Sequence, residues 1–154
     1  MARATIKGRS VGGPAFVQLH HYLTDSQAWR WSSPGERAVY LEIARLYNGK
    51  NNGALALSAR AAAERCRINK DTANKAFSNL RKRGLIECVT TGSFSQKINF
   101  ASEWRLTAFA CDKTGRAASK EFMRWRPPPS PQTGQQNADH GPNVGAQRSP
   151  RSGQ

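Results

Sequence analysis

Residues 58–84, SARAAAERCRINKDTANKAFSNLRKRG, constrain the fold of this chain more than any other stretch of its sequence. They divide into two segments with helical periodicity, separated by a turn of only a few residues. Ser58 is a good N-cap for the first segment, because its hydroxyl can accept a hydrogen bond from a free backbone N–H. The apolar residues that follow recur every three or four positions, at Ala59, Ala62, Ala63 and Cys66. This stripe of small side chains predicts a short helix against which another helix packs closely.

The second segment predicts a longer helix that begins after Asn69 and ends at Gly84. Asn69 is a suitable N-cap, Ile68 fills the turn before it, and a basic last turn suits the helix dipole. The inward face repeats the spacing of the first helix, at Ala73, Ala76, Phe77 and Leu80. The outward face and its flanks are polar or charged, at Asp71, Asn74, Lys75, Ser78, Asn79 and Lys82.

Together the two segments predict a helix-turn-helix, whose second helix is the one that enters the major groove of DNA. A solvated helical hairpin is the alternative, and the flanking strands argue against it. Strand-forming residues follow at 85–90 and resume at 97–100 after a break at Thr91-Gly92-Ser93, and residues 53–57 offer a short third strand. The predicted fold class is therefore mainly α with a small antiparallel wing sheet (α+β), a winged helix-turn-helix.

Residues 53–100 resemble the winged helix-turn-helix DNA-binding domains of the GntR and MarR families. The resemblance is carried by Leu57-Ser58, Ala62-Ala63, Ile68-Asn69, Thr72-Ala73, Ala76, Leu80 and Gly84-Leu85-Ile86. Over about residues 14–126 the chain is also similar to small helix-turn-helix proteins of bacterial genomes and mobile elements. That wider likeness is carried by Ala28-Trp29, Tyr40-Leu41, Asn48-Gly49, Asn51-Asn52-Gly53, Trp104-Arg105-Leu106-Thr107 and Phe122-Met123-Arg124-Trp125. These resemblances imply binding to DNA and a regulatory role.

One residue departs from the pattern of these families, because Arg67 stands in the turn where they usually carry a glycine. A left-handed backbone at Arg67 costs about 1 kcal/mol, which capping by Asn69 can offset. The sequence leaves two alternatives open, a left-handed Arg67 or a turn of slightly different shape.

The charge of the chain favours the same ligand. Its 154 residues include 24 basic and 10 acidic side chains, for a formal net charge of +14. Positive charge is concentrated in residues 60–83, as the neutralisation of phosphates would require. A merely basic protein, or one bound to an anionic membrane, is the alternative. There is no apolar run of the roughly 18 residues that a membrane helix needs, and no secretory segment follows Met1. We therefore expect a cytoplasmic, nucleoid-associated protein.

The predicted domain covers residues 14–126, between a flexible basic arm (1–13) and a disordered tail rich in Pro, Gln and Gly (127–154). A helix is expected over residues 16–23, where Thr24-Asp25-Ser26 supplies a stop or a new cap. Ser33-Pro34-Gly35-Glu36 opens the first helix of the winged domain, and Asn48-Gly49 closes it. The buried face expected for that helix consists of Ala38, Val39, Leu41, Ile43, Ala44, Leu46 and Tyr47.

The C-terminal part of the domain is expected to add less regular structure. Residues 101–107 predict either the end of the wing's return strand or a separate edge strand. A polar connector follows, and residues 119–125 predict one or two helical turns with an aromatic face.

The sequence gives no indication of catalysis. It lacks a Gly-rich phosphate loop, a carboxylate pair and a nucleophile elbow, so neither catalytic residues nor a cofactor are expected. Cys66, Cys88 and Cys111 have no metal-ligand spacing with the histidines, so no metal site is predicted. Buried thiols are the expected state of these cysteines, and a redox-sensing thiol is the alternative.

The DNA-contacting residues are predicted from their positions on the second helix, its supporting helix and the wing. The amides of Asn74 and Asn79 match adenine, and Lys75 can donate to guanine acceptors. The remaining candidates of the second helix contact bases or phosphates, and they are Lys70, Thr72, Ser78 and Lys82. Phosphate contacts elsewhere are expected from Arg60, Arg65, Arg67, Ser93, Ser95 and Lys97.

Two functional classes follow from this pattern. The first is a sequence-specific transcriptional regulator that binds double-stranded DNA, and the second is a plasmid or phage replication or recombination accessory protein. RNA binding and protein binding through Trp29, Trp31 and Trp125 are the weaker alternatives. A homodimer is compatible with a palindromic site, with residues 16–23 or 119–126 as its interface.

Overall fold

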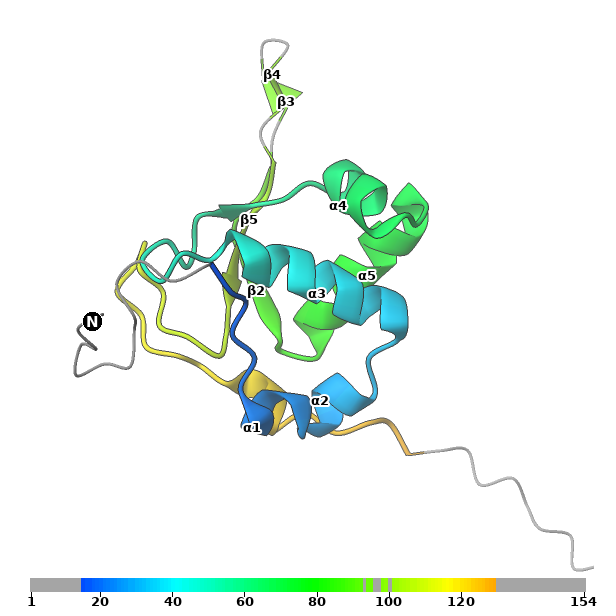
Figure 1. Cartoon of the computed structure of the whole chain (residues 1–154), viewed down its shortest axis with the longest axis vertical. Helices are drawn as coiled ribbons and strands as arrows, with labels where there is room; N and C mark the ends of the chain where they lie inside the picture. The colour runs from blue at the N-terminus through cyan, green and yellow to red at the C-terminus, as the bar shows by residue number, and fades with distance from the viewer. Residues whose placement is uncertain (1–14, 93, 96–97, 100, 130–154) are drawn as a thin grey trace, which may run out of the picture.

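The computed structural model describes residues 15–92, 94–95, 98–99 and 101–129 of the chain. Its elements are α1 (His21–Thr24), α2 (Gln27–Arg30), α3 (Pro34–Leu46), β1 (Leu55–Ala56), α4 (Ala59–Cys66), α5 (Lys70–Lys82), β2 (Ile86–Thr90), β3 (Phe94–Ser95), β4 (Ile98–Asn99), β5 (Glu103–Leu106) and the 3₁₀ helix η1 (Glu121–Met123). Helices α3, α4 and α5 pack on one another beside a small sheet, and the β3–β4 hairpin projects away from the body of the molecule (Figure 1). The predicted arm (1–13) and nearly all of the predicted tail lie outside the described residues.

The start of α3 is fixed by a complete capping box. The Ser33 hydroxyl accepts from the Glu36 N–H at 3.3 Å, and the Glu36 carboxylate accepts from the Ser33 N–H at 2.7 Å. Together these bonds satisfy two backbone donors that the first turn leaves unpaired. The buried face of α3 is formed by Val39, Tyr40, Ile43 and Ala44. Leu41, which we expected on this face, is 39% exposed because it lies on the far side of the helix.

The helix pair α4–α5 forms as the sequence predicts. The side chains of Ser58 and Asn69 accept from the N–H groups of Ala61 and Thr72, at 3.1 and 2.7 Å. Between the helices, Arg67 takes the left-handed conformation, with φ 53° and ψ 44°. This geometry lets the Ile68 N–H bond back to the Ala63 carbonyl at 3.0 Å and close the end of α4. The first of the two alternatives for the turn is therefore correct.

The main sheet is antiparallel, with the strand order β1-β5-β2. Its register pairs Leu55 with Trp104 and Ile86 with Leu106. Strand β5 is thus the return strand of the wing and also the central strand of the sheet, so the edge-strand alternative is wrong. The physical reason is that β5 pairs with β1 on one side and with β2 on the other, which leaves it no free edge. Helices followed by this small sheet give a winged helix-turn-helix of the α+β class, which confirms the predicted fold class.

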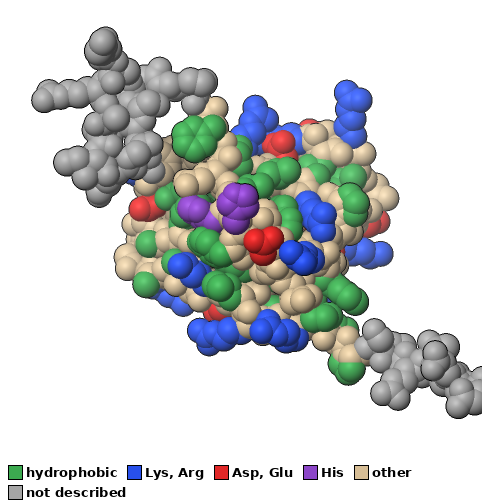
Figure 2. Space-filling view, turned by 60° about the horizontal axis from the view of Figure 1, so that its bottom comes forward, with side chains coloured by type: hydrophobic (Ala, Val, Ile, Leu, Met, Phe, Trp, Pro, Cys, Tyr) green, Lys and Arg blue, Asp and Glu red, His purple; other side chains and the backbone are tan. Residues whose placement is uncertain are grey.

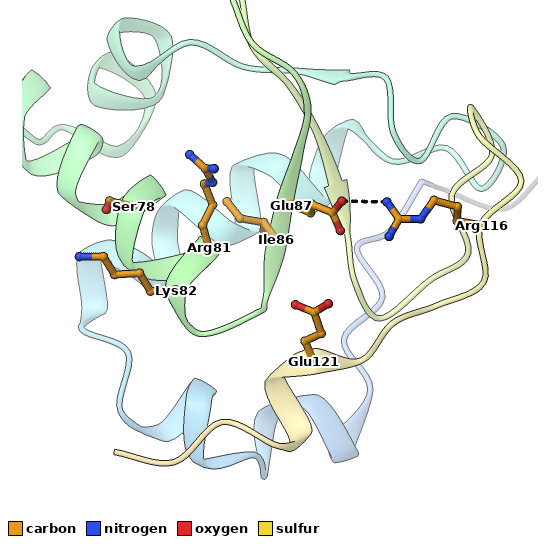
Figure 3. Close-up of a pocket in the computed structure, with 7 residues that line it drawn as sticks. All are labelled: Ser78, Arg81, Lys82, Ile86, Glu87, Arg116 and Glu121. Carbon is orange, nitrogen blue, oxygen red and sulfur yellow. Dashed lines mark hydrogen bonds and ion pairs between the residues drawn. The ribbon is translucent and has the colours of Figure 1, made fainter. Parts of the chain in front are cut away.

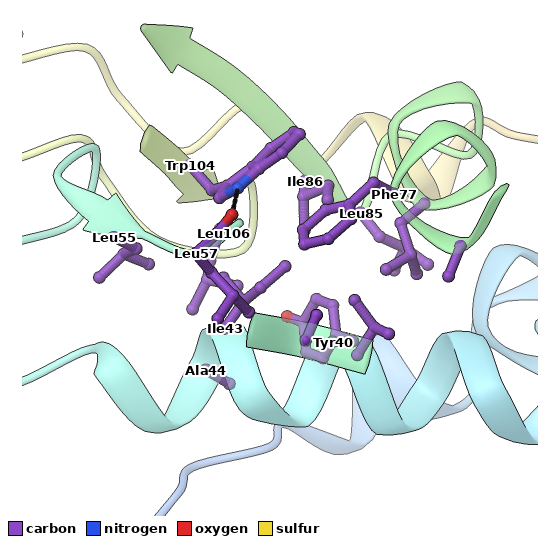
Figure 4. Packing of buried hydrophobic residues seen from close by; sticks show 14 of the residues in the cluster. Tyr40, Ile43, Ala44, Leu55, Leu57, Phe77, Leu85, Ile86, Trp104 and Leu106 are labelled. Carbon is purple, nitrogen blue, oxygen red and sulfur yellow. Dashed lines mark hydrogen bonds between the residues drawn. The ribbon is translucent and has the colours of Figure 1, made fainter. Parts of the chain in front are cut away.

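The hydrophobic core lies between α3, α5 and the sheet, as Figure 4 shows. Phe77 of α5 stacks on Trp104 of β5 with ring centroids 4.6 Å apart. The Trp104 indole N–H donates to the Leu57 carbonyl at 2.9 Å, so its polar atom is satisfied inside the core. These contacts hold the inward face of α5 against the strands that support the wing.

Gly84 joins α5 to β2 with a positive φ of 69°. The N–H groups of Gly84 and Leu85 bond back to the carbonyls of Arg81 and Leu80, at 2.9 and 3.0 Å, which is the Schellman pattern of a helix end. A Cβ at Gly84 would lie 2.7 Å from the Glu121 Cβ, so η1 packs directly on this position. The fully buried Phe122 anchors η1 there.

The prediction of a helix over residues 16–23 is wrong for most of that range. Residues 15–20 have no regular structure, and α1 begins only at His21. No side chain caps α1, and Phe16 is 73% exposed, so little packing is gained to offset the cost of helix nucleation. The face with α1 and α2 mixes hydrophobic, basic and histidine side chains (Figure 2). The alternative of a new helix after Thr24 is correct, since the Ser26 hydroxyl accepts from the Trp29 N–H and caps α2.

Candidate nucleic-acid interface

The outward face of α5 is exposed, polar and basic. Six of the predicted contact residues are exposed on this face, and they are Lys70, Thr72, Asn74, Lys75, Ser78 and Lys82. Among the described residues, none of these side chains has a hydrogen bond or an ion pair. The one acid on this face, Asp71, lies in the first turn, where it complements the positive end of the helix dipole. The face therefore presents donors and positive charge that no hydrogen bond or ion pair within the described ranges uses.

The opposite face of α5 is locked into the core. Ala73 and Leu80 are fully buried, and Ala76 and Phe77 are 2% and 5% exposed. The alanines allow α5 to approach α3 and α4 closely, and these are the helices it contacts most. A helix held this tightly on one side presents its other side in a fixed orientation.

We predicted Asn79 on the outward face of α5 or its flank, but its side chain is turned toward α3. Its amide Nδ2 donates to the Glu36 carboxylate at 2.6 Å, and the same carboxylate accepts from Arg83 at 2.5 Å. Burial opposes the ionisation of Glu36, but hydrogen bonds from Asn79, the Ser33 N–H and Arg83 outweigh it and hold its pKa below the ordinary value. The prediction that Asn79 pairs with adenine does not fit this arrangement, in which its amide ties α5 to α3.

The three arginines of α4 and the turn are exposed, but two of them are held by carboxylates. The Arg60 Nε lies 3.4 Å from Glu64, and the Arg65 Nη1 lies 3.6 Å from Glu42 of α3. Arg67 has no such partner within the described part of the chain. Exposed ion pairs of this kind are weak, so all three guanidinium groups remain accessible to an external phosphate.

Of the wing candidates, Ser93 and Lys97 lie outside the described residues, and so does the side chain of Ser95. The base of the wing is described, and there the Gly92 N–H donates to the Ser102 hydroxyl at 3.0 Å. Lys113 bonds Glu103 at the start of β5. These contacts fix the two strands from which the β3–β4 hairpin extends.

Arg81 is a further exposed cation of α5, which the sequence analysis did not name among the candidate contact residues. Arg81 is exposed on the flank of α5 that faces the sheet, and it lines two clefts. The foot cleft, of about 250 Å³, lies between α5 and the base of the wing and includes Asn74, Ser78, Ser102 and Trp104. The lower cleft, of about 530 Å³, lies between α5, β2 and η1 (Figure 3). The signal was present, since Arg81 follows Phe77 by four residues and Asn74 by seven, but we assigned it to the helix dipole.

The described residues contain no cluster of three or more His, Cys, Asp or Glu side chains that could hold a metal ion. No helix within the described ranges is long and apolar enough to cross a membrane. The cysteines were expected to be buried, and this is correct for Cys111, whereas Cys66 and Cys88 are only half-buried. Burial and the nearby Glu42 raise the pKa of the Cys66 thiol.

Comparison with known proteins agrees with this geometry. Residues 33–86, from the cap of α3 to the start of β2, match the model of a family described as a helix-turn-helix domain. No curated protein and no solved structure matches the chain. The match and the arrangement of α3, α4 and α5 together support a helix-turn-helix DNA-binding fold. The likeness to the GntR and MarR families is not tested by this match and stays a prediction.

Proposed function

We propose that this protein binds double-stranded DNA in a sequence-specific manner and acts as a transcriptional regulator. The observation that carries the proposal is α5, whose inner face is fixed in the core, while the cations of its outer face and the Asn74 amide have no hydrogen bond or ion pair among the described residues. A rigid helix with a width of about 10–12 Å fits the major groove of B-form DNA.

In this proposal α5 lies in the major groove and reads bases through the middle of its exposed face. The Asn74 amide can pair with adenine N6 and N7, and the Lys75 ammonium can donate to guanine O6 and N7. Thr72 and Ser78 supply hydroxyls that contact bases or phosphates, and Lys70 lies at the entry of the helix. Since all five side chains are exposed, no unfolding is needed before they reach a base edge.

Phosphate contacts set the affinity and the register of the complex without reading its sequence. We assign them to Lys82, to Arg60, Arg65 and Arg67 beside α5, and to the wing residues Ser93, Ser95 and Lys97. The left-handed backbone of Arg67 places this arginine at the exposed turn between α4 and α5.

The biological role is proposed on the same basis. A regulator of a bacterial mobile element, located at the nucleoid and acting as a homodimer on a palindromic site, is the role we favour. A plasmid or phage replication or recombination accessory protein is the alternative. Chromatin immunoprecipitation with sequencing separates the two roles, because promoter sites support regulation and sites at replication origins or recombination junctions support the alternative.

Titration of labelled duplex DNA, single-stranded DNA and RNA of one sequence, at two salt concentrations, tests the binding proposal. We expect the duplex to bind most tightly, with an affinity that falls steeply as salt rises, because each neutralised phosphate releases counterions. Preferential binding of RNA or single strands, or an affinity independent of salt, would contradict the proposal.

A further inference from the structure

The foot cleft has an apolar floor and a polar rim without acidic side chains. Its floor is the stacked pair of Phe77 and Trp104, whose indole N–H is already bonded to Leu57. The rim carries Ser78 and Arg81 of α5 on one side and Ser102 on the other. None of the described residues that line this cleft is an Asp or a Glu.

The donors of this rim are free to bind a ligand. The Arg81 guanidinium makes no hydrogen bond or ion pair within the described ranges. The Ser102 oxygen accepts from the Gly92 N–H, which leaves the hydroxyl proton for an external acceptor. A guanidinium and hydroxyls around an apolar floor match a sugar–phosphate chain, whose phosphate oxygens accept and whose sugar carbons are apolar.

The lower cleft is different, because it contains two carboxylates. Glu87 is bonded to Arg105 and to Arg116, at 2.5 and 3.0 Å. Burial opposes its ionisation, but these arginines outweigh burial and keep the pKa of Glu87 below its ordinary value. The Glu121 carboxylate has no hydrogen bond or ion pair among the described residues and projects toward the cleft (Figure 3). The lining also includes Arg81, Lys82 and Arg116, so Glu121 is the one unpaired carboxylate among the residues that line this cleft. Its charge makes this cleft less favourable to a phosphate than the foot cleft, whose lining has no acidic residue.

Resting on the proposed function, we infer that one sugar–phosphate strand of the bound duplex lies in the foot cleft, with Arg81 as its phosphate ligand. If α5 occupies one groove of the DNA and the wing reaches the next groove, the DNA backbone that separates the two grooves has to pass between α5 and the base of the wing. Ser78 and Ser102 hold this strand from both sides, and Glu121 limits its path beyond Arg81.

Arg81→Gln tests this inference in the full-length protein, because it removes one exposed guanidinium and keeps a polar side chain. Arg30→Gln is the matched control, since Arg30 is 65% exposed and belongs to α2, which lines neither cleft. Binding of a fluorescein-labelled duplex of mixed sequence is measured by anisotropy at several salt concentrations. Lys75→Ala is included to report on α5 in the major groove.

Arg81→Gln is expected to weaken binding roughly tenfold at low salt. The slope of log affinity against log salt should fall in magnitude by about 0.9, the value for one lost phosphate contact. Arg30→Gln should leave the slope unchanged. If Arg81→Gln behaves as Arg30→Gln does while Lys75→Ala weakens binding, the cleft assignment is wrong and the proposed function stands. If the wild-type protein does not prefer duplex DNA, both are wrong.

Discussion

The carboxylate of Glu36 on α3 and the guanidinium of Arg83 at the end of α5 form an ion pair of 2.5 Å, with side chains only 8% and 12% exposed. Glu36 also accepts from Asn79 of α5 and from its own N-cap residue, Ser33. One carboxylate thus joins the start of α3 to the second half of α5. The orientation of the proposed reading helix depends on this contact as well as on apolar packing.

Glu36→Gln is expected to lower the free energy of unfolding by about 2 kcal/mol. The amide keeps the shape of the side chain, but it leaves the half-buried Arg83 without an opposite charge. Urea denaturation followed by circular dichroism measures the loss. Arg45→Gln is a suitable control, because Arg45 is 71% exposed and lies 3.8 Å from Glu42, so we expect little change there. Equal stability of the two variants would contradict the role of Glu36.

The contribution of Glu36 should depend on pH. Its pKa in the folded protein is below the ordinary value of 4.5, so its stabilisation is complete above that value and is lost as the pH falls through the folded-state pKa. The difference in unfolding free energy between wild type and Glu36→Gln should therefore shrink as the pH is lowered from about 5 to about 3. A difference that stays constant over this range would contradict the expectation.

Gly84→Ala should destabilise the protein, and Gly35→Ala should not. At Gly84 the backbone is left-handed, and a Cβ would lie 2.7 Å from the Glu121 Cβ and 2.9 Å from the Phe122 nitrogen. We expect a loss of about 2–4 kcal/mol. Gly35 lies in the first turn of α3 with nothing within 4 Å of an added Cβ, so alanine there should stabilise by roughly 0.5–1 kcal/mol. Thermal unfolding of both variants measures the contrast, and a stable Gly84→Ala would show that η1 does not pack on this turn.

The elements that the sequence predicted correctly are those specified by local signals. Ser58 and Asn69 are the predicted cap residues, and each accepts the backbone hydrogen bond expected of it. Helix α3 begins where the sequence 33–36 indicates, and the Ser33 hydroxyl caps it. The apolar spacing of α5 gave the buried face without error, because every residue of that face packs on α3, α4 or the sheet. Caps and periodicity act within a few residues, so they can be read without knowledge of the fold.

The features that the sequence did not reveal depend on contacts between distant residues. Asn79 was placed among the base readers because its partner, Glu36, is 43 residues away. The central position of β5 follows from pairing with both β1 and β2, which local alternation does not specify. Arg81 lines the foot cleft only because the fold brings Ser102, at the base of the wing, to the other side of that cleft.

Arg67→Gly should raise the stability of the fold and lower its affinity for DNA. Arg67 has φ 53°, a conformation that costs a non-glycine residue about 1 kcal/mol, so glycine should stabilise the fold by about that amount. The same change removes a proposed phosphate contact and should weaken duplex binding several-fold. Arg67→Ala is the matched variant, since it removes the charge without relieving the backbone. A Gly variant that binds DNA as well as wild type would exclude Arg67 from the interface.

Lys75→Ala and Asn74→Ala should lower specific DNA affinity and leave the fold intact. Both side chains are exposed and make no hydrogen bond or ion pair within the described part of the chain, so their removal should change stability little. The loss of a bidentate base contact is expected to cost about 1–3 kcal/mol in binding. Gel-shift titration on a selected site measures this loss, and Lys50→Ala, an exposed lysine before β1, controls for charge. Wild-type affinity in both variants would reject the placement of α5 in the groove.

Asn79→Ala should lower stability and leave base preference unchanged, which is the opposite of what we expect for Asn74→Ala. Its amide donates to the ionised Glu36, and the loss of such a bond in a half-buried site should lower the unfolding free energy by about 1–2 kcal/mol. Base preference should not change, because the amide faces α3 instead of the groove. Selection of binding sites from randomised duplexes with wild type, Asn74→Ala and Asn79→Ala measures both effects. If Asn79→Ala keeps full stability but alters preference at one base pair, its amide turns from Glu36 to the DNA on binding, and α5 then reads bases over a wider arc than the free protein presents.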